Sequence, residues 1–371
     1  MGTVKKVCAV RLVWSLQRLA LVAGIAFGAA AWGAVPPALQ ATGPYRLGRG
    51  YHLDSLGITL GGYVNFRYEN TQGQQANLKA HDLSLFLGWR PSPIWRVFSE
   101  TEVGDAFTID NDGVSDTGRE VDIERLYAEH DLSTGLRVRV GKFLTPIGRW
   151  NLIHADPLVW SVSRPLTTSA AFARHASGTE VIGTTAVGKG ALDFRAFVDA
   201  TARLDPSQRT EDAFMDSNAQ PNPRNSFDHA SGLRLLYRSP DDDLQLGVSA
   251  AQFEFQDRPH VKRLAGVDFL YTADGMELTG EGVYRESLGD AEGDDYGAFV
   301  QLAVPLGGGF HGVVSHERYR SGLFPRPADI DTAGLTYRPL PPLSIKLERR
   351  ETRGEEQLAP DGWLLALSVL L

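Results

Sequence analysis

Short segments in which apolar and polar residues alternate with a period of two recur along the chain, and they constrain the fold most. In residues 82–89, Leu83 and Leu85 fall on one face while Asp82 and Ser84 fall on the other. Because successive side chains of a strand point to opposite faces, each such segment predicts a β-strand with one apolar and one polar face. The same pattern recurs in 58–69, 94–103, 136–141, 192–199, 233–238, 296–304 and 343–348.

Counting every candidate segment predicts sixteen strands, and a membrane barrel needs roughly 9–11 residues per tilted strand to cross a bilayer. The last one, 362–371, carries Trp363, Leu365, Leu367, Val369 and Leu371 at every second position. Outer-membrane proteins commonly end on such an amphipathic strand. The expected strands are 58–69, 78–89, 94–104, 119–130, 136–142, 178–187, 191–200, 229–238, 243–255, 261–272, 275–285, 295–305, 309–320, 329–338, 342–350 and 362–371.

The connections between these segments fall into two classes, which alternate. Tight connections rich in turn-forming residues lie at 90–93, 131–135, 188–190, 239–242, 273–274, 306–308 and 339–341. Longer polar connections lie at 70–77, 105–118, 143–177, 201–228, 256–260, 286–294, 321–328 and 351–361. Short turns on one side and long loops on the other, with an even strand number, are typical of a transmembrane β-barrel of the bacterial outer membrane.

We therefore expect an all-β fold, a transmembrane antiparallel β-barrel over residues 57–371 with about sixteen strands. A soluble β-sandwich or solenoid is the alternative, but it gives no reason for loop length to segregate in this way. Eighteen strands stay open as a count, because the stretch 44–56 also carries strand-like residues, including Tyr45 and Tyr51. After the N-terminal segment no apolar run reaches 18 residues, which argues against membrane-spanning helices.

Residues 1–34 have the parts of a secretory signal peptide. Four cations, Lys5, Lys6, Arg11 and Arg18, precede an apolar run from Leu19 to Ala31, and small residues follow. We expect cleavage between Ala31 and Ala41, a short periplasmic N-terminal segment at 35–56, and export through the inner membrane to the outer membrane. An uncleaved anchor helix is the alternative, although the run is shorter than the roughly 20 residues of a spanning helix.

Charge and cysteine content exclude several classes of function. Without the four cations of the signal peptide, 33 Lys and Arg stand against 45 Asp and Glu, a net charge of −12 that argues against a nucleic-acid partner. The single cysteine, Cys8, lies in the signal peptide, so the remaining chain can form neither a disulfide nor a thiolate metal site.

The connection at 143–177 is the most informative segment. It opens on Gly141-Lys142-Phe143-Leu144-Thr145-Pro146-Ile147-Gly148-Arg149-Trp150-Asn151. This stretch resembles porins of the bacterial outer membrane, in particular the phosphate-selective porin family and related porin-like proteins. In sixteen-stranded porins the third long loop folds into the lumen and narrows it, and 143–177 is the third long connection here. The resemblance thus implies an inward-folded constriction loop and a homotrimer.

This loop is basic within an acidic protein. Lys142, Arg149, Arg164 and Arg174 against Asp156 give it a net charge of +3, and His154 also lies in it. Cations in a narrow pore of low dielectric concentrate anions. Four further arginines could extend this positive charge along the wall if they face inward: Arg137, Arg139, Arg195 and Arg234. The alternative is that Asp193, Glu100 and Glu102 pair with these arginines and leave a nearly neutral pore.

Other sequence motifs give weaker evidence about function than the third loop does. The acidic stretch from Asp105 to Asp116 superficially resembles a calcium loop, but Thr108 stands where an EF-type loop begins with Asp, so a solvated loop is favoured. Trp150 and Trp160 are expected to pack the third loop against the wall, and Trp89, Trp95 and Trp363 to lie in an interfacial belt. Neither catalytic motifs nor cofactor signatures are present, so we expect no catalytic residues, metal or cofactor.

The sequence thus predicts an outer-membrane porin, a passive aqueous channel for small hydrophilic solutes with a mild preference for phosphate-like anions. Its expected partners are outer-membrane lipid, the solutes or anions, and two further copies of the chain. A non-conducting barrel that serves as an adhesin or as a scaffold for a partner is the second hypothesis. A barrel enzyme is the third, because such enzymes place Ser and His on strand faces where motif searches miss them.

Overall fold

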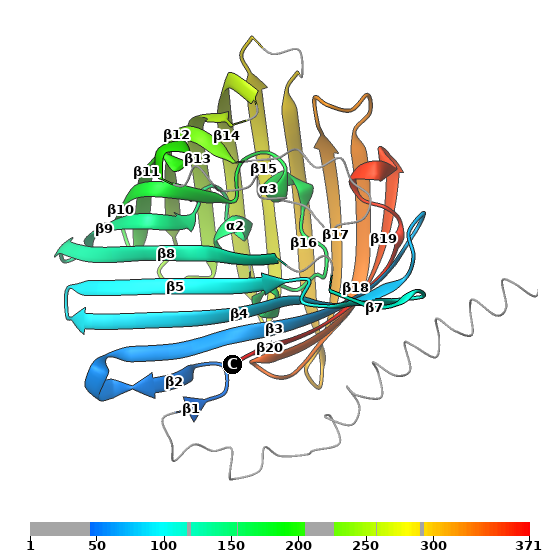
Figure 1. Ribbon diagram of the computed structural model, residues 1–371. Coiled ribbons are helices and arrows are strands. Elements are labelled where there is room, and N and C mark those ends of the chain that lie inside the picture. The colour runs from blue at the N-terminus through cyan, green and yellow to red at the C-terminus, as the bar shows by residue number, and fades with distance from the viewer. Residues whose placement is uncertain (1–44, 117–119, 154, 205–225, 257, 290–292) are drawn as a thin grey trace, which may run out of the picture. The chain divides into compact units, whose positions relative to one another are not determined.

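A computed structural model describes residues 45–116, 120–153, 155–204, 226–256, 258–289 and 293–371 of the chain (Figure 1). The chain divides into Met1–Arg46, of which only the two-residue strand β1 (Tyr45–Arg46) is described, and a large unit, Leu47–Leu371. The expected signal peptide, 1–34, lies outside the described residues. Among the described residues, no helix is long and apolar enough to span a membrane.

The large unit is a closed antiparallel barrel of sixteen strands, as expected from the sequence. Each strand pairs with the next, and the last pairs with the first: Gly362–Leu370 lies in register with Tyr63–Thr71. The barrel strands are β3 (Ile58–Thr71), β4 (Asn77–Ser92), β5 (Trp95–Gly104), β8 (Glu120–Ser133), β9 (Leu136–Leu144), β10 (His175–Val187), β11 (Gly190–Asp199), β12 (Phe227–Arg238), β13 (Leu244–Phe255), β14 (Arg258–Ala273), β15 (Met276–Ser287), β16 (Asp295–Gly307), β17 (Phe310–Arg320), β18 (Ala328–Leu340), β19 (Leu343–Gly354) and β20 (Gly362–Leu370).

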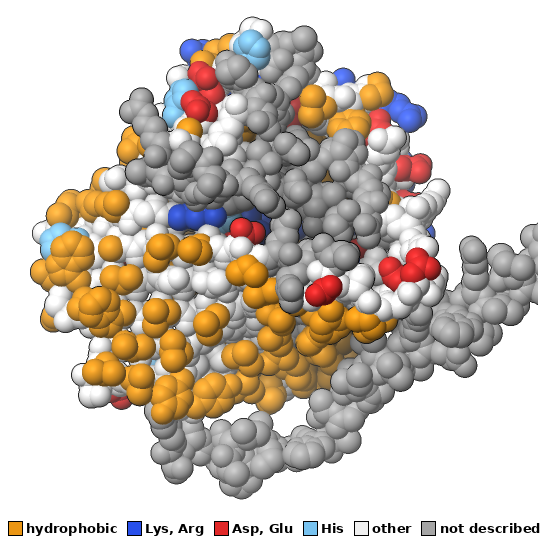
Figure 2. All heavy atoms as spheres, viewed as in Figure 1, with side chains coloured by type: hydrophobic (Ala, Val, Ile, Leu, Met, Phe, Trp, Pro, Cys, Tyr) orange, Lys and Arg blue, Asp and Glu red, His pale blue; other side chains and the backbone are white. Residues whose placement is uncertain are grey.

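The alternation predicts the two faces of the wall correctly. Leu85, Val140 and Val198 are 61%, 55% and 58% exposed on the outer surface, while Ser84 and Glu100 on the lumen face are almost fully buried. Figure 2 shows hydrophobic side chains gathered in a broad band over the outer face of the strands at the front of the view. The expected belt residues Trp89, Trp95 and Trp363 are also exposed. An apolar outer surface of this kind suits a lipid environment.

The expected division between tight turns and long connections is confirmed. The hairpin between β14 and β15 turns through two residues, Asp274 and Gly275, with φ of 50° and 78°. Positive φ at both central residues defines the turn whose twist matches a two-stranded ribbon, and Asp-Gly suits it because glycine adopts this conformation without strain. The long connections all lie at the opposite ends of the strands.

Two stretches differ from the expected pattern. Within the stretch 44–56, Gly50–Leu53 forms the short strand β2, which pairs with the first three residues of β3. β2 pairs with residues 58–60 of β3, whereas β20 pairs with residues 63–71 of the same strand. β2 therefore covers backbone groups of β3 beyond the end of β20 and is not a further membrane-spanning strand. The eighteen-strand count is therefore wrong. The acidic loop forms a small hairpin of β6 (Thr108–Asp110) and β7 (Gly113–Ser115) beside β4.

The remaining elements are short. One, η2 (Asp54–Leu56), lies between β2 and β3. Five lie in the long connections: α2 (Trp150–Ile153), η3 (Asp156–Leu158), α3 (Leu166–Ser169), α4 (Thr201–Leu204) and η4 (Glu356–Leu358).

The outer belt generates a stability prediction. We expect Leu85→Arg to lower the free energy of folding into phospholipid vesicles by about 2–4 kcal/mol, because it places a cation in the bilayer core. Val114 on β7 is even more exposed, at 73%, but lies in a long connection. Val114→Arg should therefore change the folding free energy by less than about 0.5 kcal/mol. Equal effects in urea titrations of the two variants would contradict a lipid-facing belt.

Candidate functional site: the lumen and its inner loop

The connection between β9 and β10, residues 145–174, folds into the barrel, and we call it the inner loop. Figure 1 shows its helices α2 and α3 within the ring of strands. Its contacts reach lumen-facing side chains of β3, β15, β17, β18 and β19, which lie far from it in the sequence. The expectation that the third long loop turns inward is confirmed.

Three glutamates on alternate strands hold the backbone of the inner loop. Glu281 on β15 accepts hydrogen bonds from the amides of Arg149 (2.7 Å) and Trp150. Glu317 on β17 accepts from the amides of Leu166 (3.0 Å) and Thr167 (2.6 Å). The carboxyl groups of Glu281, Glu317 and the third glutamate, Glu348, are all largely buried. Hydrogen bonds to these carboxyl oxygens satisfy backbone amides that would otherwise be unpaired in the lumen.

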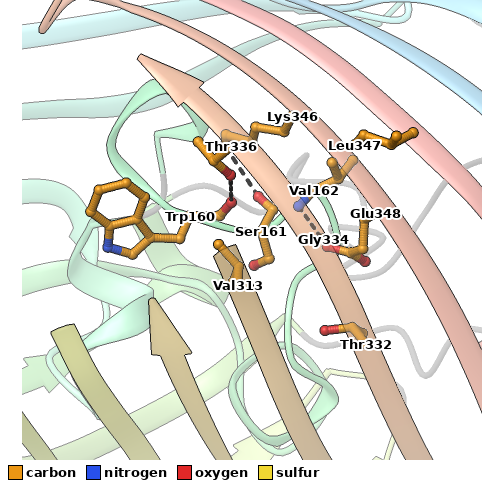
Figure 3. A pocket seen from close by; sticks show the side chains of 10 residues that line it. All are labelled: Trp160, Ser161, Val162, Val313, Thr332, Gly334, Thr336, Lys346, Leu347 and Glu348. Carbon is orange, nitrogen blue, oxygen red and sulfur yellow. Dashed lines mark hydrogen bonds between the residues drawn. The ribbon is translucent and has the colours of Figure 1, made fainter. Parts of the chain in front are cut away.

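The third glutamate, Glu348 on β19, lies where the inner loop crosses β18 and β19 (Figure 3). It accepts from the amide of Val162 at 2.8 Å. Beside it, Lys346 donates to the carbonyl of Ser161 at 3.1 Å, and Thr336 on β18 donates to the carbonyl of Trp160 at 2.7 Å. Side chains of the wall thus replace water as partners for three consecutive residues of the loop.

Apolar contacts hold the same loop against the wall. Trp150 meets Phe299 edge-on, with ring centroids 5.8 Å apart, and the ring of Trp160 lies under the guanidinium of Arg338 at 3.8 Å. The expectation that these two tryptophans pack the loop is confirmed. A larger apolar cluster joins Ile147 and Phe172 of the loop to phenylalanines of β11, β12 and β13. This part of the barrel interior is therefore filled by dry apolar side chains.

Asp156 is the acidic residue of the inner loop, and it binds the wall at β3. It accepts from Asn65 and, at 3.1 Å, from Arg67. Burial alone would raise the pKa of Asp156, but the positive charges of Arg67 and Lys346 outweigh burial and hold the pKa below its usual value. This carboxylate is therefore ionised and neutralised by the wall, so it subtracts little from the positive charge of the loop.

The cations expected on the inner loop occupy different environments. Arg149 donates to Oε1 of Gln245 at 3.1 Å, and Arg164 donates to Oδ1 of Asn151 at 2.9 Å, so both have neutral partners, and both are half-buried. Burial, with Arg174 nearby, lowers the pKa of Arg164 to about 9, so its guanidinium is charged at neutral pH. Arg174 lies 3.5 Å from Glu124 on β8.

Two further expected residues are not placed in the lumen. Lys142 on β9 lies in register with Leu126, whose side chain is 46% exposed on the outer face. Directly opposed residues of two strands share a face, so Lys142 lies on the outer face, apart from the lumen cations. His154 lies outside the described residues.

The four wall arginines face inward, and each is paired with a carboxylate. Arg139 bonds Glu129 at 2.7 Å and Glu180 at 2.9 Å, and Arg195 bonds Glu180 at 3.4 Å. Arg137 bonds Asp131 at 2.8 Å. Arg234 bonds Asp268 at 2.6 Å. The alternative in which acids pair with these arginines is correct, but the partners differ from those expected: Asp193 bonds Arg238, and Glu100 bonds Arg125.

The two members of several of these ion pairs differ in exposure. The side chains of Arg137 and Arg195 are 35% and 30% exposed, whereas those of Glu129 and Glu180 are 6% and 0% exposed. On this part of the wall the guanidinium groups of Arg137 and Arg195 are thus more exposed than Glu129 and Glu180, and Asp131, the second partner of Arg137, is 25% exposed beside them and belongs to the same surface. We call this surface, on β8 to β11, the arginine layer. A nearly balanced set of charges can thus present a positive surface.

A row of aromatic rings supports the arginines on the neighbouring strands. Phe86, Phe98 and Tyr127, on β4, β5 and β8, follow one another with ring centroids 5.8 and 5.5 Å apart. Arg125 lies over Phe98 at 4.7 Å and Arg139 over Tyr127 at 4.1 Å. Cation–π contacts and ion pairs together fix the guanidinium planes. Sequence reasoning missed this row and Arg125, although their inward parity within the alternating strands was a usable signal.

Comparisons with known proteins support the fold. No family model matches the chain, and no curated protein matches its sequence. Among solved structures, OmpT in its trimer form, an outer membrane protein of Vibrio cholerae, has a TM-score of 0.57 at 8% identity, over 85% of this chain and 99% of that one.

Two porins are similar to the same degree. OmpF of Salmonella typhi, in complex with daunomycin, has a TM-score of 0.56 at 10% identity, over 86% of this chain and 98% of that one. The anion-selective porin from Comamonas acidovorans has a TM-score of 0.53 at 15% identity, over 84% and 98%. The chain therefore has the fold of a porin-like barrel. No phosphate-selective porin is among these structures.

The glutamate contacts generate a prediction about the inner loop. Glu281→Ala should leave the buried amides of Arg149 and Trp150 without partners, at a cost of about 1–3 kcal/mol each. Hydrogen exchange in 145–153 should then accelerate at least tenfold while exchange in the strands stays unchanged. Glu277→Ala is the matched control, because Glu277 lies four residues earlier on β15 and, with the strand period of two, on the same face. Equal protection in both variants would show that Glu281 does not hold the loop.

Proposed function

We propose that this protein is an outer-membrane porin, a passive channel for small hydrophilic solutes with a mild preference for anions. The observation that carries the proposal is a charged, hydrogen-bonding lumen inside a closed barrel whose outer surface is apolar. Such a wall can replace the hydration of a small polar solute during passage, and movement down the solute's own gradient requires no cofactor. The porin-like fold supports this assignment, and under it the long connections face outside the cell.

The preference for anions rests on two groups of charges. The arginine layer exposes guanidinium groups beside buried carboxylates. On the inner loop, Arg149 and Arg164 add charges whose hydrogen-bond partners are neutral. Guanidinium groups bind planar and tetrahedral oxyanions through paired N–H donors, so carboxylates and phosphate-like anions are the favoured solutes. The similar structure from Comamonas acidovorans is described as an anion-selective porin, which agrees with this proposal.

A non-conducting barrel is the second candidate, and one observation favours it. The apolar cluster around Phe172, Phe227 and Phe253 fills part of the interior with dry side chains, as a scaffold or adhesin would tolerate. The charged and partly exposed side chains of the arginine layer argue for the channel, because a sealed interior has no use for them. We propose no enzymatic role.

Ion selectivity tests the proposal directly. In planar bilayers under a KCl gradient, we expect the wild-type protein to conduct and to favour chloride. The double variant Arg149→Gln, Arg164→Gln should lower the chloride-to-potassium permeability ratio at least twofold, because it removes lumen charge without leaving a carboxylate unpaired. Arg318→Gln removes the same kind of charge from the outer face, where Arg318 is 56% exposed, and should leave the ratio unchanged.

Two results would contradict the channel and its preference separately. Folded wild-type protein that gives no conductance steps would favour the non-conducting barrel. Conductance with a preference for potassium would keep the porin but overturn the anion argument.

We also propose that the exported protein loses its signal peptide by cleavage between Ala31 and Ala41 and assembles as a homotrimer. The parts of a signal peptide support the first point. The second is supported by the similar OmpT structure, which is described in a trimer form. Native mass spectrometry of protein extracted from outer membranes should give three chains, each beginning between Ala31 and Ala41. A full-length chain would contradict processing, and a single chain would contradict the trimer.

A further inference from the structure

Three side chains that can bind a metal ion meet on the outer wall, at the ends of β12 and β13 that carry the long connections. Asp228 and His229 come from β12, and Glu254 comes from β13, its neighbour in the barrel (Figure 1). One ligand atom from each lies within 4.8 Å of the other two. Their side chains are 48%, 56% and 21% exposed, so ions in solution can reach them.

A β-bulge creates this arrangement. Phe227 pairs with Phe255 and His229 pairs with Glu254, so Asp228 is an extra residue without a partner in the register. Phe227 and Ala230 on either side point inward and are buried. The bulge therefore lets two consecutive residues, Asp228 and His229, point outward, opposite Glu254. A regular strand would have turned one of them into the barrel interior.

The contacts of the imidazole give the three residues different roles. Nδ1 of His229 lies 2.9 Å from Oδ2 of Asp228, and a carboxylate only accepts, so Nδ1 carries the proton. The lone pair of neutral His229 then lies on Nε2, which is 3.7 Å from Oε1 of Glu254. Zn²⁺ binds imidazole nitrogen and carboxylate oxygen at about 2.0–2.2 Å. Two atoms 3.7 Å apart can therefore bind one such ion without movement of either strand.

We propose that His229 and Glu254 form a surface site for a divalent transition-metal ion of the zinc class. Asp228 orients the imidazole, as carboxylates do behind metal-bound histidines. Water completes the coordination, so the ion is exchangeable. Imidazole selects against Ca²⁺ and Mg²⁺, which take oxygen ligands. This site is independent of the porin proposal, because it lies on the outer wall and shares no residue with the lumen.

A second exposed histidine provides a matched control. Nδ1 of His316 lies 2.7 Å from Oδ1 of Asp331, and the two side chains are 58% and 43% exposed. However, Arg353 bonds the other oxygen of Asp331 at 2.6 Å. This pair therefore has a cation where His229 has a second carboxylate, and a dication is repelled there.

Isothermal titration of ZnCl₂ into untagged, folded protein in detergent, with millimolar Ca²⁺ and Mg²⁺ present, tests the proposal. We expect one equivalent of Zn²⁺ to bind, His229→Ala and Glu254→Ala to abolish binding, and His316→Ala to leave it unchanged. Asp228→Asn should weaken binding about tenfold or more, as loss of an orienting carboxylate does.

Three outcomes would overturn the site. The first is a wild-type protein that does not bind Zn²⁺, and the second is unchanged Zn²⁺ binding by His229→Ala. The third is displacement of Zn²⁺ by the excess of Ca²⁺ or Mg²⁺. Because all three side chains point outward from the strand ends, the variants should fold, and an unchanged circular dichroism spectrum checks this for each.

Discussion

Closure of the sheet is the constraint on which the rest of the molecule depends. The last strand pairs with the first over nine residues, from Gly362 opposite Thr71 to Leu370 opposite Tyr63, and leaves neither strand with an open edge there. An open edge in hydrocarbon would expose unpaired amides and carbonyls, each at a cost of several kcal/mol. The short strand β2 completes the same edge where β20 ends. Closure in turn separates an apolar outside from a polar interior.

Closure of the barrel places charged side chains in its interior, where they are paired with groups of opposite charge. Charges removed from bulk water need partners, and each predicted wall arginine has a carboxylate within hydrogen-bond or ion-pair distance. The inner loop brings unpaired backbone amides into the same space, and Glu281, Glu317 and Glu348 accept from them. Acidic side chains of the wall thus both bind the inner loop and neutralise the arginines.

Pairing does not make the two signs equivalent to a solute. Arg137 and Arg195 are 35% and 30% exposed, whereas their partners Glu129 and Glu180 are 6% and 0% exposed. Stacking on Tyr127 holds Arg139 in the same layer. The exposure of individual side chains, more than net charge, therefore determines which charges line the lumen, and a protein with more acidic than basic residues can still expose cations inside.

The sequence alone determined the fold class, the sixteen strands, the sides of the tight turns and the inward direction of most lumen arginines. These features are local, because period-two alternation sets the face of each side chain and turn residues set the ends of strands. The same alternation would also have placed Lys142 outside, and only the tertiary structure decided which acids pair with those arginines and that Asp228, His229 and Glu254 meet. Such contacts depend on the stagger between strands and on single-residue bulges, such as that at Asp228, which shift register without leaving a mark in hydrophobic periodicity.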